Sequence, residues 1–187
     1  MKNSGFLQKN LDDACEKLKN DINTSIEKAT GDAFLGHIPY IKTLRSLAYS
    51  ALTIRDELFL DKLVQFLLHY ERFSLKEKEE LIEKMESEED KINFGKKLFW
   101  MLDKLDDISK AELMAISLKS FVQGKFSRND LMEIWTGIDR LSIVHIPILK
   151  QIYSENIRNL SFPQHLSTTG FVYFDLANST PQCSSYS

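Results

Sequence analysis

The sequence predicts an all-α protein, built as a compact multi-helix bundle with a long N-terminal amphipathic helix and a short β-like C-terminal arm. Only four prolines and seven glycines occur among the 187 residues, so few breakers interrupt the predicted elements. Apolar residues recur every three or four positions through most of the chain, which is the helical period. From residue 74 onward, serines followed three positions later by an acid recur, as expected at the starts of short helices.

Length and composition favour one domain with appendages. Apolar residues make up 43% of the sequence and charged residues 27%, which is ordinary for a globular protein. We expect three regions: the N-terminal helix in residues 1–35, the helical bundle in residues 36–160, and the partly disordered arm in residues 161–187. A chain of this length buries about 70% of its unfolded surface, so its core requires neither a metal nor a disulfide.

The first predicted element is an amphipathic helix over residues 6–29, ended by Thr30-Gly31-Asp32. Its apolar positions keep to one face because they are spaced three or four residues apart. They are Leu7, Leu11, Cys15, Leu18, Ile22, Ile26 and Ala29. Such a face lies against the protein's own core, a second copy or a protein partner, and packing in the core is the simplest of these interpretations.

Residues 39–70 form the most apolar stretch and predict two helices. Pro39 suits the first turn of a helix, and a helix that is apolar on two faces is typical of the centre of a bundle. We expect Arg55-Asp56-Glu57 to form a bend before a second helix over residues 58–70. Arg55 is expected to pair with an acid or to bind a partner. An interfacial membrane helix is the second interpretation, and a span the third, because the apolar run is shorter than about 20 residues.

Five serines predict the helix starts that follow. In a capping box, the serine hydroxyl accepts a hydrogen bond from a main-chain N–H of the first turn, and an acid three residues later reaches back. The motif occurs at Ser74, Ser87, Ser109 and Ser127, and Ser142 is a further candidate without the acid. We therefore expect helices to start near residues 75, 88, 110, 128 and 143.

The stretch LDKLDDISKAEL, residues 102–113, is rich in acids and permits two interpretations. We favour a helix end followed by a helix start, with Ile108 before the cap and Glu112 as the capping acid. A calcium loop requires a central glycine and alternating oxygen ligands, and this stretch has neither. The alternative is a metal-binding or hydrolytic site built on Asp103, Asp107 and Glu112.

The last part of the chain changes in character. Two segments, 66–81 and 121–134, share a Phe-Ser pair between an aromatic helix end and a new helix. This indicates either a duplicated helix–turn–helix unit or two similar ways of joining antiparallel helices. After Leu160 the residues favour turns, apart from Phe171 to Phe174, which favour a strand. A single strand is not stable alone, so this one must pair with another segment or pack as an extended arm.

No motif predicts a reaction. The chain has no dinucleotide fingerprint, P-loop, zinc-protease helix or nucleophile elbow, and its four histidines are far apart in the sequence. We therefore expect no catalytic residue, no cofactor and no metal ligand, and we expect Trp100 and Trp135 to anchor the core. The net charge of −3 without a basic stripe argues against nucleic-acid binding. Cys15 and Cys183 form no paired motif, which fits a reducing cytoplasm, and the N-terminus does not resemble a signal peptide.

Three segments resemble a group of small bacterial and phage proteins, some of which carry an abortive-infection label: IPYIKTLRSLAYSALTIRDELFLDKLVQFL, FGKKLFWMLDKLDDISKAEL and FVQGKFSRNDL. The resemblance covers residues 36–155, and residues 57–150 are also faintly similar to the tellurite-resistance TerB-like domains. It implies a compact helical bundle and a link to phage–host conflict or stress, without an established reaction. TerB-like domains can bind metal through acids. Only Glu77 and Asp130 fall at comparable helix starts, and their capping role already explains them.

These observations lead to one functional hypothesis and two alternatives. We expect a non-enzymatic, homo-oligomeric protein of the cytoplasm, of phage or mobile-element origin, that binds a protein partner or a second copy in defence or counter-defence. The residues expected to bind are Leu7, Leu11, Leu18, Ile22, Ile26 and Arg55. The first alternative is a membrane-acting abortive-infection effector, peripheral to the membrane, that uses apolar residues 38–70. The second is a metal-binding TerB-like domain.

Overall fold

A computed structural model describes residues 20, 24, 27–29, 31–32, 34–37, 54–155, 164–175 and 180–183. This part of the chain is mainly helical, which confirms the all-α class. Its α-helices are α3 (Ile54–Tyr70), α4 (Leu75–Glu83), α5 (Glu88–Lys104), α6 (Ser109–Val122), α7 (Arg128–Arg140) and α8 (Ile146–Glu155). Short 3-10 turns are η1 (Leu35–His37), η2 (Ile143–His145) and η3 (Gln164–Thr169), and the strands are β1 (Val172–Asp175) and β2 (Thr180–Cys183).

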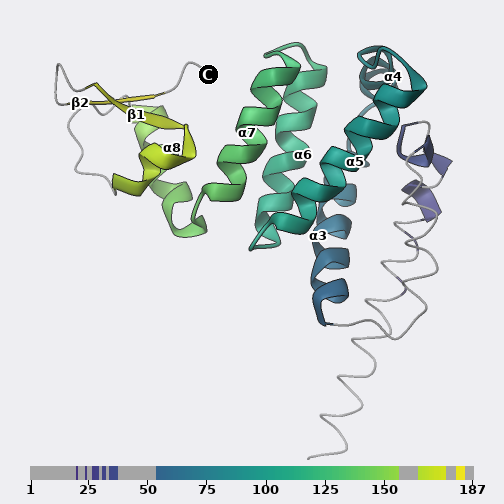
Figure 1. Cartoon of the computed structure of the whole chain (residues 1–187), viewed down its shortest axis with the longest axis horizontal. Helices are drawn as coiled ribbons and strands as arrows, with labels where there is room; N and C mark the ends of the chain where they lie inside the picture. Colours follow the sequence, from purple (N-terminus) through teal and green to yellow (C-terminus); the bar gives the residue numbers. More distant parts are fainter. Residues whose placement is uncertain are drawn as a thin grey trace, which may run out of the picture.

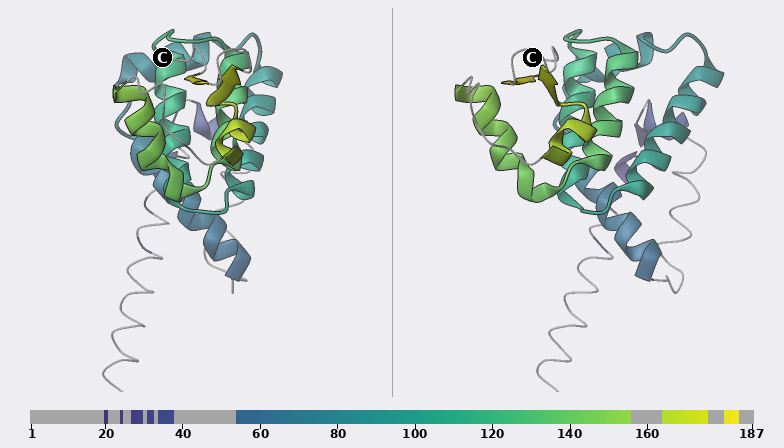
Figure 2. Two further views of the ribbon diagram at one scale, coloured as in Figure 1. Left: turned by 90° about the vertical axis from the view of Figure 1, so that its left-hand side faces the viewer. Right: turned by 60° about the vertical axis from the view of Figure 1, so that its left-hand side comes forward.

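Helices α3 to α7 form the bundle, and α6 packs against both α3 and α7. In Figure 1, η1 lies at the right of the bundle beside α5, whereas α8 and the strands lie at the left. Figure 2 shows α8 leaning away from α6 and α7, with η3 between them. Strands β1 and β2 pair antiparallel, with Val172 opposite Cys183. The C-terminal elements thus extend the bundle on one side.

The main core is aromatic at its centre. Trp135 is fully buried, its ring lies 5.7 Å from that of Phe94, and its indole Nε1 donates a 3.0 Å hydrogen bond to the Ser117 hydroxyl. Phe34 also packs against Phe94, edge to face, with ring centroids 6.0 Å apart. The expectation that Trp135 anchors the core is confirmed.

Trp100 does not belong to the core, so the expectation for this residue is wrong. Its side chain is 51% exposed. The buried residues of α5, which include Leu98, Met101 and Leu102, face α3 and α7, and Trp100 falls on the opposite side of the same helix. A bulky aromatic in a helical pattern is buried only when its angular position faces the bundle.

Three of the serine motifs act as predicted. The Ser74 hydroxyl accepts from the Glu77 main chain at 3.2 Å, and the Glu77 carboxylate accepts from the Ser74 N–H at 2.8 Å, which completes a capping box. Ser127 and Asp130 form the same reciprocal pair at the start of α7. The Ser87 hydroxyl accepts from the Asp90 main chain, and α5 begins at Glu88. The predicted starts of α4, α5 and α7 are confirmed.

Two other predicted caps are wrong. Helix α6 begins at Ser109 itself, because the Asp107 carboxylate accepts from the main-chain N–H and the hydroxyl of Ser109, at 2.8 and 2.7 Å. Ile108 therefore occupies the capping position, in a helical backbone conformation, and Glu112 lies 3.2 Å from the ring of His69. Ser142 precedes η2 without a side-chain cap bond. Asp107, rather than the Ser109 hydroxyl, forms the turn at the start of α6. An aspartate side chain readily accepts a hydrogen bond from the main-chain N–H two residues later.

The region around residue 55 also differs from expectation. Arg55, Asp56 and Glu57 lie in the first turn of α3, so the predicted bend at these residues is wrong. The side chain of Arg55 lies outside the described part of the chain, and so do Leu7, Leu11, Leu18, Ile22 and Ile26. The binding roles of these six residues therefore stay predictions. The same holds for the long N-terminal helix and for the C-terminal arm as a single element.

Most apolar residues of α3 face the bundle, although Leu58 and Leu68 are 50% and 42% exposed. Leu60, Leu63, Phe66 and Leu67 are all buried in the main core. Within the described ranges, no helix combines the length and the apolar character that crossing a membrane would require.

Candidate functional site

A prominent candidate site in the part of the chain that the structure describes is an apolar groove between the bundle and α8, which we call the α6–α8 groove. Its volume is about 500 Å³. Helix α6 contributes Leu113 and Ile116, and α7 contributes Ile134 and Ile138. Ile146 and Leu149 of α8, together with Phe171, line the facing wall. Aliphatic and aromatic side chains from four segments therefore meet in one open groove.

The groove exists because the C-terminal elements have a small core of their own. Leu141, Leu149 and Leu166 are buried together and form a cluster separate from the main core. Phe171 packs against both clusters and joins them. Helix α8 is held by this second cluster at its base, so the faces of α6 and α7 beside it stay uncovered.

Gly137 allows the C-terminal elements to dock on α7. A Cβ atom at this position would lie 2.7 Å from the main-chain oxygen of Thr169 and 2.9 Å from the ring of Phe171. Contacts that short do not occur in folded proteins, so any larger residue would push η3 away. The position of the groove wall therefore depends on a glycine in the middle of a helix, where glycine is otherwise unfavourable.

The groove offers little polar chemistry. The Ser117 hydroxyl is already engaged, because it donates to the main-chain oxygen of Met114 at 2.8 Å and accepts from Trp135. Lys150 lies on the exposed side of α8, and Ile116 is 50% exposed although it is a large aliphatic residue. A surface of this composition suits apolar side chains of another protein segment.

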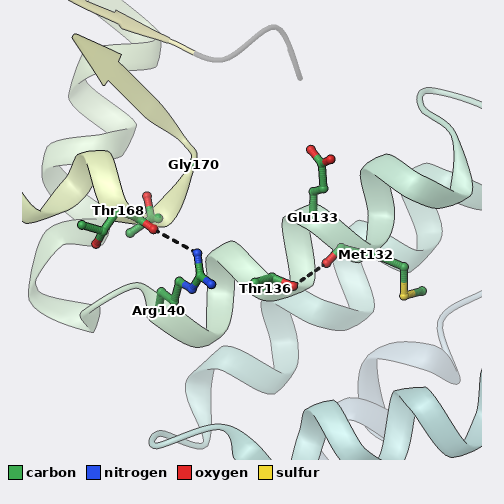
Figure 3. Close-up of a pocket in the computed structure, with 7 residues that line it drawn as sticks. Met132, Glu133, Thr136, Arg140, Thr168 and Gly170 are labelled. Carbon is green, nitrogen blue, oxygen red and sulfur yellow. Dashed lines mark hydrogen bonds between the residues drawn. The ribbon is translucent and has the colours of Figure 1, made fainter.

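A second, more polar hollow of about 450 Å³ lies between α7 and η3. Figure 3 shows Arg140 reaching toward Thr168, and the Arg140 guanidinium donates a 3.5 Å hydrogen bond to the main-chain oxygen of Thr168. The Thr136 hydroxyl donates to Met132 of its own helix. Arg140 is exposed and its hydrogen bond is long, so the guanidinium is only weakly held in this hollow.

The acids of residues 102–113 do not share one site. Asp107 accepts from Ser109, and these hydrogen bonds hold its pKa below the ordinary value. Glu112 pairs with His69, and the main-chain oxygen of Asp103 accepts from Lys62 at 2.9 Å. In the ranges that the structure describes, no group of three histidine, cysteine or acidic residues is placed to hold a metal ion.

The two acids that match TerB-like helix starts are engaged in protein contacts. Glu77 accepts a 2.9 Å hydrogen bond from Gln123 and lies 3.4 Å from Lys119, so it links α4 to α6. Partial burial acts to raise its pKa, but hydrogen bonds from Ser74, Gln123 and Lys119 lower it below the ordinary value. Asp130 caps α7 through Ser127.

A buried polar cluster around Asp32 was not predicted. Its carboxylate, 9% exposed, accepts from the main chain of Phe34 and Leu35, from the Tyr70 hydroxyl at 3.0 Å and from Lys78 at 2.8 Å. Burial acts to raise the pKa of Asp32, yet these donors lower it below its ordinary value. Burial and the neighbouring Asp32 both raise the pKa of Tyr70. An adjacent cavity of about 30 Å³ has room for little more than one water, so the cluster is structural.

Comparison of the chain with protein-family models, curated proteins and solved structures gives no match.

Proposed function

We propose that this protein is a non-enzymatic protein-interaction module whose α6–α8 groove binds an amphipathic helix. The observation that supports it is the groove itself, an open surface about 500 Å³ in volume and lined mainly by aliphatic and aromatic side chains. An amphipathic helix binds such a groove by inserting apolar residues spaced three and four positions apart. Leu113 and Ile116 on one wall, with Ile146 and Leu149 on the other, offer contacts along its length.

The occupant that fits best is the N-terminal segment, residues 6–29, of a second copy. Its predicted apolar stripe, Leu7, Leu11, Leu18, Ile22 and Ile26, has the required spacing. Of the residues that follow it, Phe34 and Leu35 are buried in the main core. The turn η1, which starts at Leu35, lies beside α5 on the opposite side of the bundle from α8 (Figure 1). Starting from that side, the segment reaches the groove of another copy more readily than its own.

A peptide-binding experiment tests this proposal. A fluorescent peptide of residues 4–31 is titrated with full-length protein carrying Leu11→Glu and Leu18→Glu, so that the receiving chain cannot supply its own segment. We expect saturable binding, measured by fluorescence anisotropy. Adding Ile116→Glu to the receiver should weaken binding at least about 10-fold, which corresponds to about 1.4 kcal/mol, because the carboxylate would be buried against the apolar stripe.

Leu75→Glu is the matched control. Leu75 is 81% exposed on α4, outside the groove, so the same change in chemistry should leave peptide binding unaltered. Both substitutions affect exposed side chains, and both variants should unfold at the same temperature as the parent. Equal affinities of the Ile116→Glu and Leu75→Glu receivers would contradict the proposal, as would an absence of saturable binding to the parent.

We also propose that this binding acts in phage defence or counter-defence in the cytoplasm. The resemblance of residues 36–155 to abortive-infection-type proteins supports this role. Expression of the wild-type protein in a bacterial host should change the plaquing efficiency of a phage panel, and Ile116→Glu should abolish the change while Leu75→Glu keeps it. Identical plaquing with and without the wild-type protein would count against the biological role and leave the binding experiment unaffected.

A further inference from the structure

The exposed side of α5 has an unusual composition. Its exposed residues after Glu88 are Glu89, Asn93, Lys96, Lys97, Trp100 and Lys104. At about 100° of rotation per residue, all six fall within a stripe about 100° wide along the helix. We call this the α5 stripe. Figure 1 shows α5 crossing in front of α3, with which it packs through its other side.

Trp100 lies at the centre of the α5 stripe. It is half exposed, and the ammonium groups of Lys97 and Lys104, one turn on either side, lie 4.1 and 4.5 Å from its ring centroid. These cation–π contacts hold the lysine side chains close to the ring. Tryptophan is among the residues that most often contribute a large share of the binding energy at protein interfaces.

The charges along the α5 stripe are divided. Glu86, in the turn just before α5, and Glu89 make the first part acidic, whereas Lys96 and Lys97 make the second part basic. Among the described residues, neither Glu89 nor Lys96 has an ion-pair partner. When two copies of such a surface meet in antiparallel orientation, the acidic half of each faces the basic half of the other. The surface is therefore complementary to itself.

We propose that the α5 stripe is the interface of a two-fold symmetric dimer, in which α5 packs antiparallel against α5 of a second copy with Asn93 on the axis. A residue that lies a given number of positions before Asn93 then faces the residue that lies the same number of positions after Asn93 in the other chain. Glu89, four residues before Asn93, faces Lys97, four residues after it. Trp100 packs over the start of the other α5, near Glu86. The two-fold axis makes every such contact twice, as in most protein dimers.

A second copy satisfies this surface better than a nucleic acid or an anionic membrane does. Either polyanion would be attracted to Lys96 and Lys97 but repelled by Glu86 and Glu89. A nucleobase stacking on Trp100 would also have to displace an ammonium group from the ring. Only a partner whose charges run in the opposite order can pair with both the acidic half and the basic half of the α5 stripe.

Charge reversal tests the dimer in the full-length protein carrying Leu11→Glu and Leu18→Glu, so that the N-terminal segment cannot join copies through the α6–α8 groove. Sedimentation equilibrium should show self-association that weakens when salt rises from about 50 mM to about 500 mM, because exposed charge pairs are screened. Glu89→Lys and Lys97→Glu should each weaken the dimer at least ten-fold. The double charge-reversal variant should recover an affinity within about three-fold of this parent, because the two substitutions together restore an opposite-charge pair with its signs exchanged. Lys125→Glu, an exposed lysine in the α6–α7 turn, is the control and should have no effect.

Tryptophan fluorescence gives a second measurement. Dimerisation should shield Trp100 from acrylamide, whereas Trp135 is buried in monomer and dimer alike, and Trp100→Phe should remove the change. A monomer at all concentrations, or a double variant as weak as the single ones, would overturn the dimer. Tighter binding of the Glu89→Lys variant to phosphatidylserine vesicles or to an oligonucleotide, without dimerisation, would overturn it in favour of a polyanion. Ile116→Glu should leave the dimer intact, so this test is independent of the groove.

Discussion

The ammonium group of Lys110, on a side chain only 1% exposed, donates a 2.9 Å hydrogen bond to the main-chain oxygen of Asp139 in the last turn of α7. The same ammonium pairs with Asp106. Lys62 acts in the same way at the end of α5, with hydrogen bonds to the main-chain oxygens of Asp103 and Leu105 at 2.9 and 2.7 Å. Each buried lysine places positive charge at the negative end of a neighbouring helix and satisfies carbonyl groups that the helix leaves unpaired.

Lys110→Ala should destabilise the protein strongly. The change leaves the Asp139 carbonyl without its donor and creates a cavity, which together should lower the free energy of unfolding by about 3 kcal/mol. Lys110→Met fills the space and should cost less. Urea denaturation measures both, with Lys125→Ala as the exposed control, expected to cost less than about 0.5 kcal/mol. Equal stabilities of Lys110→Ala and Lys125→Ala would show that the buried lysine contributes nothing.

Gly137→Ala should loosen the C-terminal elements without unfolding the bundle. The new Cβ would meet the Thr169 main chain at 2.7 Å, and relieving such a clash costs about 1–3 kcal/mol locally. We expect faster amide hydrogen exchange in η3, β1 and α8, with unchanged exchange in α3 and α6. Gly31→Ala is the control, because a Cβ there meets nothing within 4 Å. Uniformly faster exchange in α3 and α6 would contradict this local role.

The stability of the protein should fall at acidic pH through Asp32. Its pKa is lower in the folded protein than in the unfolded chain, so its contribution is complete above the unfolded value of about 3.9 and is lost as pH falls through the folded pKa. Asp32→Asn should therefore cost about 2 kcal/mol at pH 7 and less below pH 4. Urea denaturation between pH 3 and pH 7 measures the difference, which should shrink toward the acidic end. A difference that is constant with pH would exclude an ionised role for Asp32.

Serines that share one sequence pattern should differ when they are mutated. Ser74→Ala and Ser127→Ala each remove a capping hydroxyl and should lower the free energy of unfolding by about 1 kcal/mol. Ser109→Ala should cost less than about 0.5 kcal/mol, because its hydroxyl only donates to the exposed turn aspartate, Asp107. Thermal and urea unfolding of the three variants under one set of conditions makes the comparison. Equal losses at Ser109 and Ser127 would show that the two motifs are equivalent.

Local patterns predicted the positions of helices well. Ser74 and Ser127 start helices because a hydroxyl and an acid within four residues complete their own hydrogen bonds, with no help from distant residues. Ser109 failed for an equally local reason, since Asp107 lies two residues ahead of it and closes the turn first. The apolar stripe of α3 correctly predicted a helix that packs in the core.

Side-chain environments were harder to predict. Trp100 and Trp135 lie in similar helical patterns, yet one faces solvent and the other is fully buried, because burial depends on which side of each helix meets a neighbour. Lys110 and Asp32 were not recognised as buried polar groups, since the partners that they reach on other helices are 29 to 46 residues away in the chain. The same holds for the α6–α8 groove, whose walls come together only because Gly137 admits η3.

The amino-acid order by itself determined that this protein is helical and where most of its helices begin. Those properties depend on hydrogen bonds and periodicities that span a few residues. The tertiary structure alone decided which tryptophan is exposed, which charges are buried, and where an apolar groove stays open. These depend on how helices distant in the chain pack together, and helical spacing alone does not encode the partner that each face meets.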